Sequence, residues 1–382
     1  MTTSSIEKLK DLGIEARKAG LYAKAARFYQ QAGKLAEESR NEKERVECLF
    51  WEGYCLYLAG ETDAAMPLLM EAANCRSPEA DPADVFNAST MLIEISLDQK
   101  SASFCRKLIT QTRNWLAGIN KTNWQHNLDW LEGKLEFARG NFATAYPMFV
   151  QAREGERQNP YYPAYTQATY LRYLCITAFY LHDTDSLKQW TEIIEVCEKN
   201  HEYDKVYAKH ARLCLFRTER SVKGNFSHAS ELAISLLDML KLFEAKDTEF
   251  YESVYECLRI LMLARRWQDF DHQLERFSLK EDFAYFLFRG DEHLCRARES
   301  LGMAVKDDQW DMDFPLPEPD MPDAESGLNY LKEAAAFYEK AREEAQAKDE
   351  RLETEYYTAT LNGRLERVRA MENAVLAYLA KI

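Results

Sequence analysis

The residues that most often carry chemistry, cysteine and histidine, form no recognisable catalytic or metal-binding pattern in this sequence. The 382 residues include nine cysteines without a C-x-x-C pair and seven scattered histidines without an H-E-x-x-H motif. Zinc sites need such ligands at short, regular spacings. The sequence therefore predicts no metal site. The cysteines sit singly inside apolar helical patterns, and we expect buried, reduced thiols in a cytoplasmic protein.

The densest group of potential ligands is the run DEHLC, from Asp291 to Cys295. Consecutive residues of a helix point in different directions, so this run is predicted to be part of a surface helix and not an ion site. The sequence also lacks a phosphate-binding glycine loop, a dinucleotide-binding G-x-G-x-x-G after a strand, and a G-x-S-x-G nucleophile motif. No nucleophile or general base stands out, so we expect neither an enzyme nor a cofactor.

Composition and charge argue against several further classes of protein. A net charge of −14 opposes binding to nucleic acids or to anionic membranes, both of which attract basic surfaces. No apolar stretch approaches the roughly 20 residues that span a bilayer, and the start, MTTSSIEKLK, has no apolar core of a secretory signal. With only 14 glycines and 10 prolines, a fold of many short strands is disfavoured, and a mostly helical protein is predicted.

A nine-residue sequence cassette that occurs three times indicates where the predicted helices pack against each other. LGIEARKAG, EGYCLYLAG and EGKLEFARG each contain two glycines seven residues apart, and successive copies are offset by 40 and 80 residues. The glycine pairs are Gly13/Gly20, Gly53/Gly60 and Gly133/Gly140. Each cassette is followed by A-x3-[aromatic or Leu]-x2-A, as in Ala25, Tyr29 and Ala32, which places two small residues and one large residue on one helix face.

Each repeat is therefore predicted to be a pair of antiparallel helices. Its first glycine lies where the partner helix crosses closely, and its second glycine ends the first helix in a left-handed turn. Weaker copies are expected to turn at LHDTDS, VKGNFSHA and ARRWQD, and Ala334, Tyr338 and Ala341 repeat the second-helix pattern. Repetition at a fixed period is the signature of a solenoid.

The pattern resembles the tetratricopeptide repeat (TPR), in the long-repeat form of about 40 residues known from kinesin light chain. The first copy matches with Leu9, Leu12, Gly13, Gly20, Tyr22, Ala25, Tyr29 and Ala32. The resemblance implies a single all-α domain over 1–382, a right-handed superhelical solenoid of antiparallel helix pairs closed by an amphipathic capping helix at 350–382. The expected repeats are 6–40, 46–78, 84–118, 123–157, 162–200, 204–243, 249–278 and 282–347.

In such a solenoid the outward side of the first helices lines a concave groove. The residues expected there are Lys10, Arg17, Phe50, Trp51, Tyr54, Tyr57, Trp130, Lys134, Phe137, Tyr173 and Tyr180. The aromatic ones recur in pairs seven residues apart, and two interpretations remain open. The rings either pack between helices in the core or form an exposed apolar strip that binds a partner. Ile14 stands where carboxylate-binding TPR proteins have Asn, which argues against that kind of clamp.

An acidic, proline-rich insertion is expected at 306–326, between the two helices of the last repeat. From Asp307 to Glu325 it has eight acidic residues, four prolines and no Lys or Arg. Apolar residues alternate with acids or prolines, as in a linear interaction motif; they are Trp310, Met312, Phe314 and Leu316. The segment is interpreted as a solvated loop, a second binding motif, an internal pseudo-ligand or a protease cleavage point.

The sequence thus favours a non-catalytic scaffold or adaptor that binds a peptide or helix of another protein in its groove. The alternative is a ligand- or peptide-responsive regulator, autoinhibited or processed at the insertion. A long open aromatic surface would favour the adaptor, and a closed small pocket would favour the regulator.

Overall fold

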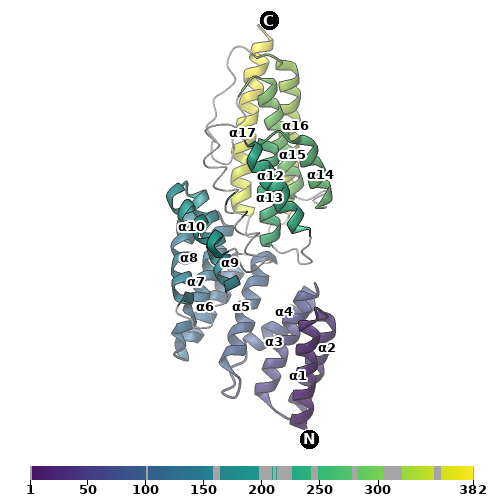
Figure 1. Cartoon of the computed structure of the whole chain (residues 1–382), viewed down its shortest axis with the longest axis vertical. Coiled ribbons are helices and arrows are strands. Elements are labelled where there is room, and N and C mark those ends of the chain that lie inside the picture. Colours follow the sequence, from purple (N-terminus) through teal and green to yellow (C-terminus); the bar gives the residue numbers. More distant parts are fainter. Residues whose placement is uncertain are drawn as a thin grey trace. The chain divides into compact units, whose positions relative to one another are not determined.

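The computed structural model describes residues 2–99, 102–157, 164–197, 209, 212, 226–241, 248–277, 283–303, 321–347 and 354–381. Every regular element in these ranges is a helix, and helices that follow one another pack in neighbouring pairs (Figure 1). The all-helical prediction is therefore confirmed for the described part of the chain. None of the helices in these ranges is long and apolar enough to cross a membrane. The chain divides into two compact units, Met1–Leu135 and Glu136–Ile382.

The first unit is built from helices of similar length joined by short turns. They are α1 (Thr2–Lys18), α2 (Tyr22–Glu38), α3 (Glu42–Leu58), α4 (Thr62–Ala73), α5 (Pro82–Gln99), α6 (Ala102–Gly118), a short 3-10 turn at Thr122–Trp124, and α7 (Gln125–Ala138) up to Leu135. Contacts join α1 to α2, α2 to α3, α3 to α4 and α4 to α5, and α1 and α5 also contact α3.

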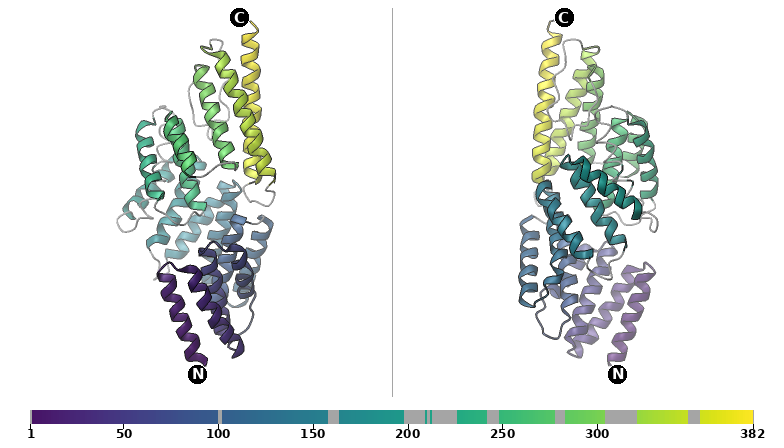
Figure 2. Two further views of the ribbon diagram at one scale, coloured as in Figure 1. Left: turned by 90° about the vertical axis from the view of Figure 1, so that its right-hand side faces the viewer. Right: turned by 60° about the vertical axis from the view of Figure 1, so that its left-hand side comes forward.

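The second unit continues with further helices. They are α8 (Phe142–Arg157), α9 (Ala164–Tyr180), α10 (Thr184–Cys197), α12 (Ser227–Leu240), α13 (Thr248–Leu263), α14 (Trp267–Arg276), α15 (Phe283–Ser300), α16 (Ala324–Ala347) and α17 (Thr354–Leu379). At its C-terminal end α15, α16 and α17 lie side by side (Figure 2). Their shared core joins residues between Phe283 on α15 and Leu379 on α17.

The turn glycines have the predicted left-handed conformation. Gly20, Gly60 and Gly140 have φ angles of +73°, +81° and +77°. The N–H of Gly20 donates to the carbonyl of Arg17 (3.0 Å), and the next N–H donates to the carbonyl five residues back (2.9 Å). This pair of hydrogen bonds is the Schellman motif, which satisfies carbonyls at the end of a helix. The same two bonds close the predicted turns at His182 and Arg265 without glycine.

The first glycine of a cassette lies under the large residue of the following helix, as predicted. A Cβ atom added to Gly13 would lie 2.8 Å from Cζ of Tyr29, and one added to Gly53 would lie 2.8 Å from Cγ of Leu69. Packed atoms do not approach this closely, so only glycine allows the two helices to cross there. The alanines on either side of each large residue are fully buried; they are Ala25, Ala32, Ala65, Ala72, Ala145, Ala152, Ala334 and Ala341.

The glutamate that precedes the helix glycine links one helix pair to the previous one. Glu52 accepts a hydrogen bond from the side-chain amide of Gln30 on α2 (3.1 Å). Glu132 in the third cassette accepts from Arg113 on α6 in the same way (2.9 Å). The Glu52–Gly53 pair therefore combines a close helix crossing with a polar contact to the preceding second helix, and Glu132 makes the same kind of polar contact.

The surface-helix prediction for the DEHLC run is wrong. Asp291 is 1% exposed and Glu292 is 3% exposed on α15. Both carboxylates are buried because arginines surround them: Arg289 and Arg296 bond Glu292 at 2.6 and 2.9 Å. Helix α17 buries one apolar face, as its amphipathic pattern predicts; the residues are Leu361, Leu365, Val368 and Val375. That α17 caps a solenoid stays a prediction.

Candidate functional site

The predicted groove residues fall into two sets. In the first unit Lys10 and Arg17 lie on α1, Phe50, Trp51, Tyr54 and Tyr57 on α3, and Trp130 and Lys134 on α7. In the second unit are Phe137 on α7 and Tyr173 and Tyr180 on α9. The candidate site is built from the first set, because α1 and α3 contact each other within one unit.

Three of the predicted groove rings are not exposed. Phe50 is 6% exposed, Trp130 is 8% and Tyr173 is 2%. Tyr173 packs against Phe137 and Phe149, with ring centroids 5.4 and 5.2 Å away. For these three rings the core interpretation holds and the exposed-strip interpretation does not. Phe137 and Tyr180 are half-buried and belong to the edge of the same aromatic core.

The two lysines of the first set already have carboxylate partners. The ammonium of Lys10 lies 2.7 Å from Glu44 and 2.8 Å from Glu47 on α3. Burial lowers the pKa of Lys10, but the hydrogen bonds to the two glutamates outweigh it and raise that pKa above its usual value. Lys134 lies 3.8 Å from the carboxylate of Glu94 on α5. Both lysines tie first helices together and are poor candidates for holding a ligand's anion.

Arg17 is different, because it has no carboxylate partner among the described residues. It lies in the last turn of α1, and its guanidinium carbon stacks over the Trp51 ring on α3, 4.3 Å from the ring centroid. Its Nε is buried without a hydrogen-bond partner, while the side chain as a whole is half-exposed. A guanidinium over an indole face is a favourable cation–π contact that leaves the charge unneutralised.

Beneath Arg17 lies a second polar group with no acceptor. Tyr29 on α2 is 1% exposed, and its hydroxyl is buried without a hydrogen bond. Burial raises the pKa of Tyr29, and the nearby Arg17 guanidinium partly offsets that rise. The Tyr29 and Trp51 rings stack with centroids 6.1 Å apart. The Arg17 guanidinium thus interacts with the Tyr29 hydroxyl beside a tryptophan, and neither group has a carboxylate acceptor among the described residues. The Tyr29 spacing identified a core residue, but nothing in the sequence signalled its hydroxyl.

Half-buried aromatic rings continue along α3 from this corner. Trp51, Tyr54 and Tyr57 are all half-buried, and the Trp51 and Tyr54 rings meet edge to face at 5.9 Å. Burial raises the pKa of Tyr54, and Arg17 again acts against that rise. The surface formed by Arg17, Trp51, Tyr54 and Tyr57 is called the α1–α3 face below. It presents a cation beside accessible aromatic area, which suits a protein segment with both acidic and apolar side chains.

A carboxyl group with a perturbed pKa lies at the start of α5. Burial, together with the negative charges of Glu47 and Asp81, raises the pKa of Asp84 from 3.8 to about 6. Lys10 acts in the opposite direction but is already paired with glutamates. At neutral pH the ionised Asp84 carboxylate is therefore only partly compensated by nearby positive charge.

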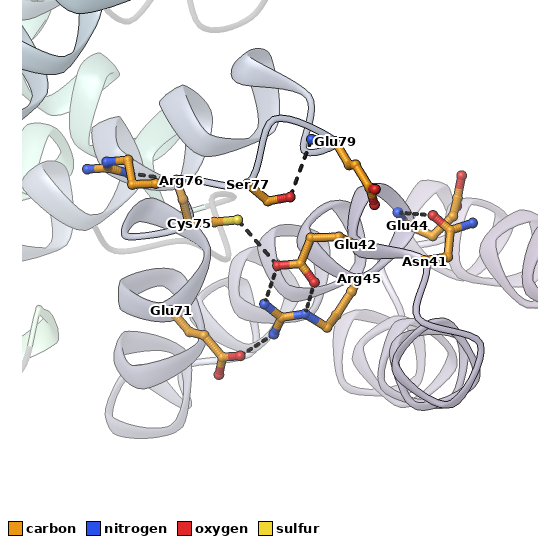
Figure 3. A network of polar contacts seen from close by, with 9 residues as sticks. All are labelled: Asn41, Glu42, Glu44, Arg45, Glu71, Cys75, Arg76, Ser77 and Glu79. Carbon is orange, nitrogen blue, oxygen red and sulfur yellow. Dashed lines mark hydrogen bonds and ion pairs between the residues drawn. The ribbon is translucent and has the colours of Figure 1, made fainter.

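Elsewhere in the first unit an arginine is saturated with partners (Figure 3). Arg45 bonds Glu42 through two nitrogens, each at 2.8 Å, and also pairs with Glu71 on α4. Cys75 donates to the same Glu42 carboxylate at 3.4 Å. The Arg45 pairing lowers the pKa of Glu42, and burial raises the pKa of Cys75, so the thiol stays protonated. This network joins the start of α3 to the end of α4 and leaves no donor of the kind seen at Arg17.

The second unit contains a polar centre that the sequence did not reveal. Asp291 accepts a hydrogen bond from the Tyr338 hydroxyl at 2.7 Å and lies 3.4 Å from both Arg259 and Arg364. All four residues are buried. They come from α13, α15, α16 and α17. The one available signal was an aspartate directly after a helix glycine, Gly290, where the first cassette has Ile14.

The described cysteines show no sign of nucleophilic activation. All but Cys75 are buried; they are Cys48, Cys55, Cys105, Cys175, Cys257 and Cys295. Burial raises the pKa of Cys48 to about 12 and that of Cys55 to about 11. Across the described ranges, no group of three or more His, Cys, Asp and Glu side chains is placed to hold a metal ion.

The predicted linear motif lies outside the described residues. Trp310, Met312, Phe314 and Leu316 all fall between 304 and 320. Their proposed roles stay predictions.

Comparison with known proteins adds no relative. No protein-family model matches the chain, and no curated protein is significantly similar to it in sequence.

Proposed function

We propose that this protein is a non-catalytic interaction module that binds a peptide or helix of a partner protein on its α1–α3 face. The observation that carries the proposal is the pairing of an uncompensated guanidinium, Arg17, with the accessible ring of Trp51. Tyr54 and Tyr57 extend the aromatic area along α3. Tryptophan, tyrosine and arginine are the residues that contribute most binding energy at protein interfaces.

We also propose that the helix pairs continue as a right-handed solenoid of the TPR type. The support is the repeated local geometry. The same Schellman turn follows successive first helices, and a glycine lies under the large residue of the next helix at Gly13 and Gly53. A solenoid presents its first helices as one extended surface, which is the surface used here.

The non-catalytic part of the proposal draws support from the state of the ionisable groups. On α3, Glu44 and Glu47 are engaged by Lys10, and Glu52 accepts a hydrogen bond from Gln30. The nearest thiol, Cys55, is buried with a raised pKa. A nucleophile would need the opposite environment, one that lowers its pKa.

The test is selection of ligands from a displayed random-peptide library on the full chain, followed by affinity measurements on variants. We expect Trp51→Ala to weaken the selected peptides by about tenfold or more, equivalent to about 1.4 kcal/mol. Trp115→Ala is the matched control, because Trp115 is a half-buried tryptophan of α6 that also carries a guanidinium, Arg76, 5.4 Å from its ring.

Circular dichroism would establish that both variants remain folded. Peptides that bind Trp51→Ala as tightly as the natural sequence, or that respond equally to Trp115→Ala, would contradict the proposal.

A further inference from the structure

Two tyrosines occupy the same place in the repeated helix pair but have different partners. Tyr29 and Tyr338 are both the large residue of an A-x3-Y-x2-A pattern, and each lies over a helix glycine, Gly13 or Gly290. The Tyr338 hydroxyl donates to Asp291, the residue directly after Gly290, at 2.7 Å. The residue directly after Gly13 is Ile14, which has no acceptor to offer. The Tyr29 hydroxyl is accordingly left without one.

The arginines near Tyr338 and near Tyr29 also differ in whether a carboxylate compensates their charge. In the second unit the Asp291 carboxylate compensates the buried Arg259 and Arg364. In the first unit Arg17 lies close enough to Tyr29 to change its pKa, yet no carboxylate among the described residues pairs with it. The framework around Tyr29 thus has the cation and the hydroxyl of the Asp291 centre but lacks the carboxylate.

A shortage of acidic residues does not explain this gap. The chain has 63 acidic and 49 basic side chains, so acids are in excess. The other half-buried cations in the described part of the first unit each hold at least one carboxylate: Lys10, Arg45 and Lys134 as described above, and Arg113, which bonds Asp129 at 3.0 Å and Glu132 at 2.9 Å. Among these half-buried cations Arg17 is the exception.

We infer that Arg17, whose guanidinium lies over Trp51, is a subsite for the carboxylate of an Asp or Glu side chain in the bound partner, and that Trp51 receives the apolar residue next to that acid. This inference rests on the proposed function and specifies the chemistry of the partner. A guanidinium can hold a carboxylate through two parallel hydrogen bonds. Its contact with Trp51 and the buried ring of Tyr29 excludes water on one side, and an ion pair is stronger where water is partly excluded.

The acid is assigned to a side chain and not to a chain terminus. The aromatic rings continue along α3 from Trp51 to Tyr54 and Tyr57, so a segment that contacts them runs on past the acid. Lys10, the other half-buried cation of α1, is already paired with Glu44 and Glu47 and cannot hold a second negative charge of the ligand.

Three synthetic peptides test the subsite on the full chain by fluorescence anisotropy. The acid peptide is acetyl-SDWDFDLS-amide, and its amide twin, acetyl-SNWNFNLS-amide, has each Asp replaced by Asn. The third peptide is the amide twin with a free C-terminal carboxylate. We expect the acid peptide to bind at least about tenfold tighter than its amide twin, and Arg17→Gln to abolish that preference.

Arg76→Gln is the matched control. Arg76 also lies over a tryptophan, but its guanidinium donates to the carbonyls of Ala73 and Cys75 at 2.8 and 2.7 Å. This variant should keep the full preference for the acid peptide. The inference would be overturned if Arg17→Gln still bound the acid peptide more tightly than the amide twin. It would also be overturned if Arg17 increased the affinity only for the peptide with the free C-terminal carboxylate.

The experiment separates the inference from the proposed function on which it rests. If the acid and amide peptides bind equally and Trp51→Ala weakens both, the α1–α3 face is a binding surface but Arg17 is not a carboxylate subsite. If none of the three peptides binds, both proposals are contradicted for an acidic, aromatic partner.

Discussion

The surroundings of Tyr29 in the first unit and of Tyr338 in the second unit differ although the local helix pair is the same. Around Tyr338, one aspartate accepts a hydrogen bond from the hydroxyl and compensates the charges of two buried arginines. Around Tyr29, a half-exposed arginine has no carboxylate partner among the described residues and lies over a half-buried tryptophan. The same helix pair thus contains a compensated charge in one unit and an uncompensated charge in the other. A charge-compensated buried centre holds helices in place, whereas an uncompensated cation at the surface is suited to recognise a ligand.

Loss of the carboxylate from the buried Asp291 centre is the largest effect expected. Asp291→Ala leaves Arg259 and Arg364 buried without their shared anion, and removing one partner from a buried ion pair costs about 3–5 kcal/mol. Urea unfolding followed by circular dichroism would measure the loss.

Glu299→Ala is the control for this change, because Glu299 lies on the same helix. Its ion pair with Arg265, at 2.9 Å, is solvent-exposed, and such pairs contribute about 0–1 kcal/mol. If Asp291→Ala were no more destabilising than Glu299→Ala, the buried centre would not have the structural role assigned to it.

Asp84 gives a smaller effect of the opposite sign. Its pKa is raised from 3.8 to about 6 in the folded protein, so the folded state binds the proton more tightly than the unfolded state does. Stability associated with Asp84 is therefore greatest below pH 3.8 and is lost as the pH rises toward 6. Asp84→Asn removes the ionised carboxylate, and at pH 7 we expect a gain of about 1 kcal/mol, reduced from the full linkage value because the group is half-buried.

The gain from Asp84→Asn should shrink when unfolding is measured near pH 4, where the natural side chain is largely protonated. Asp63→Asn is a suitable comparison, because Asp63 is an exposed aspartate in the first turn of α4. A gain that stayed constant between pH 4 and pH 7 would show that a cause other than ionisation of Asp84 is responsible.

The helices and their turns could be predicted because small residues report close packing directly. Gly13 and Gly53 are glycine since a side chain would collide with Tyr29 and Leu69, and Gly20 is glycine because its φ is positive. Both requirements are local, and the residues that meet them recur at a fixed spacing. The same A-x3-[aromatic or Leu]-x2-A spacing predicts that Tyr338 lies in the core, although it does not predict the contact with Asp291.

Exposure of the aromatic rings could not be predicted, because helical register shows only which face a side chain occupies. It does not show whether the next first helix covers that face. Trp51 and Phe50 are adjacent in sequence, yet Trp51 is half-buried and Phe50 is in the core.

Charge pairing was beyond prediction for a related reason. Lys10 meets Glu44 and Glu47, which are 34 and 37 positions away, and Asp291 meets Tyr338 across 47 positions. Nothing local distinguishes these paired charges from Arg17, which pairs with no carboxylate in the described part of the chain. The DEHLC run is predicted to lie on the surface, and that prediction fails because the Asp291 carboxylate has buried arginine partners.

The most direct test of the central claim is to supply the missing carboxylate within the chain. Ile14→Asp places an acid at the position of Asp291 in the equivalent helix pair, and Ile14→Asn is its uncharged control with the same loss of apolar packing. The affinity of acetyl-SDWDFDLS-amide would be measured for both variants. We predict that Ile14→Asp binds it at least about tenfold more weakly than Ile14→Asn does, because the new carboxylate occupies Arg17. Equal affinities would contradict the claim that Arg17 is held open for an acidic ligand.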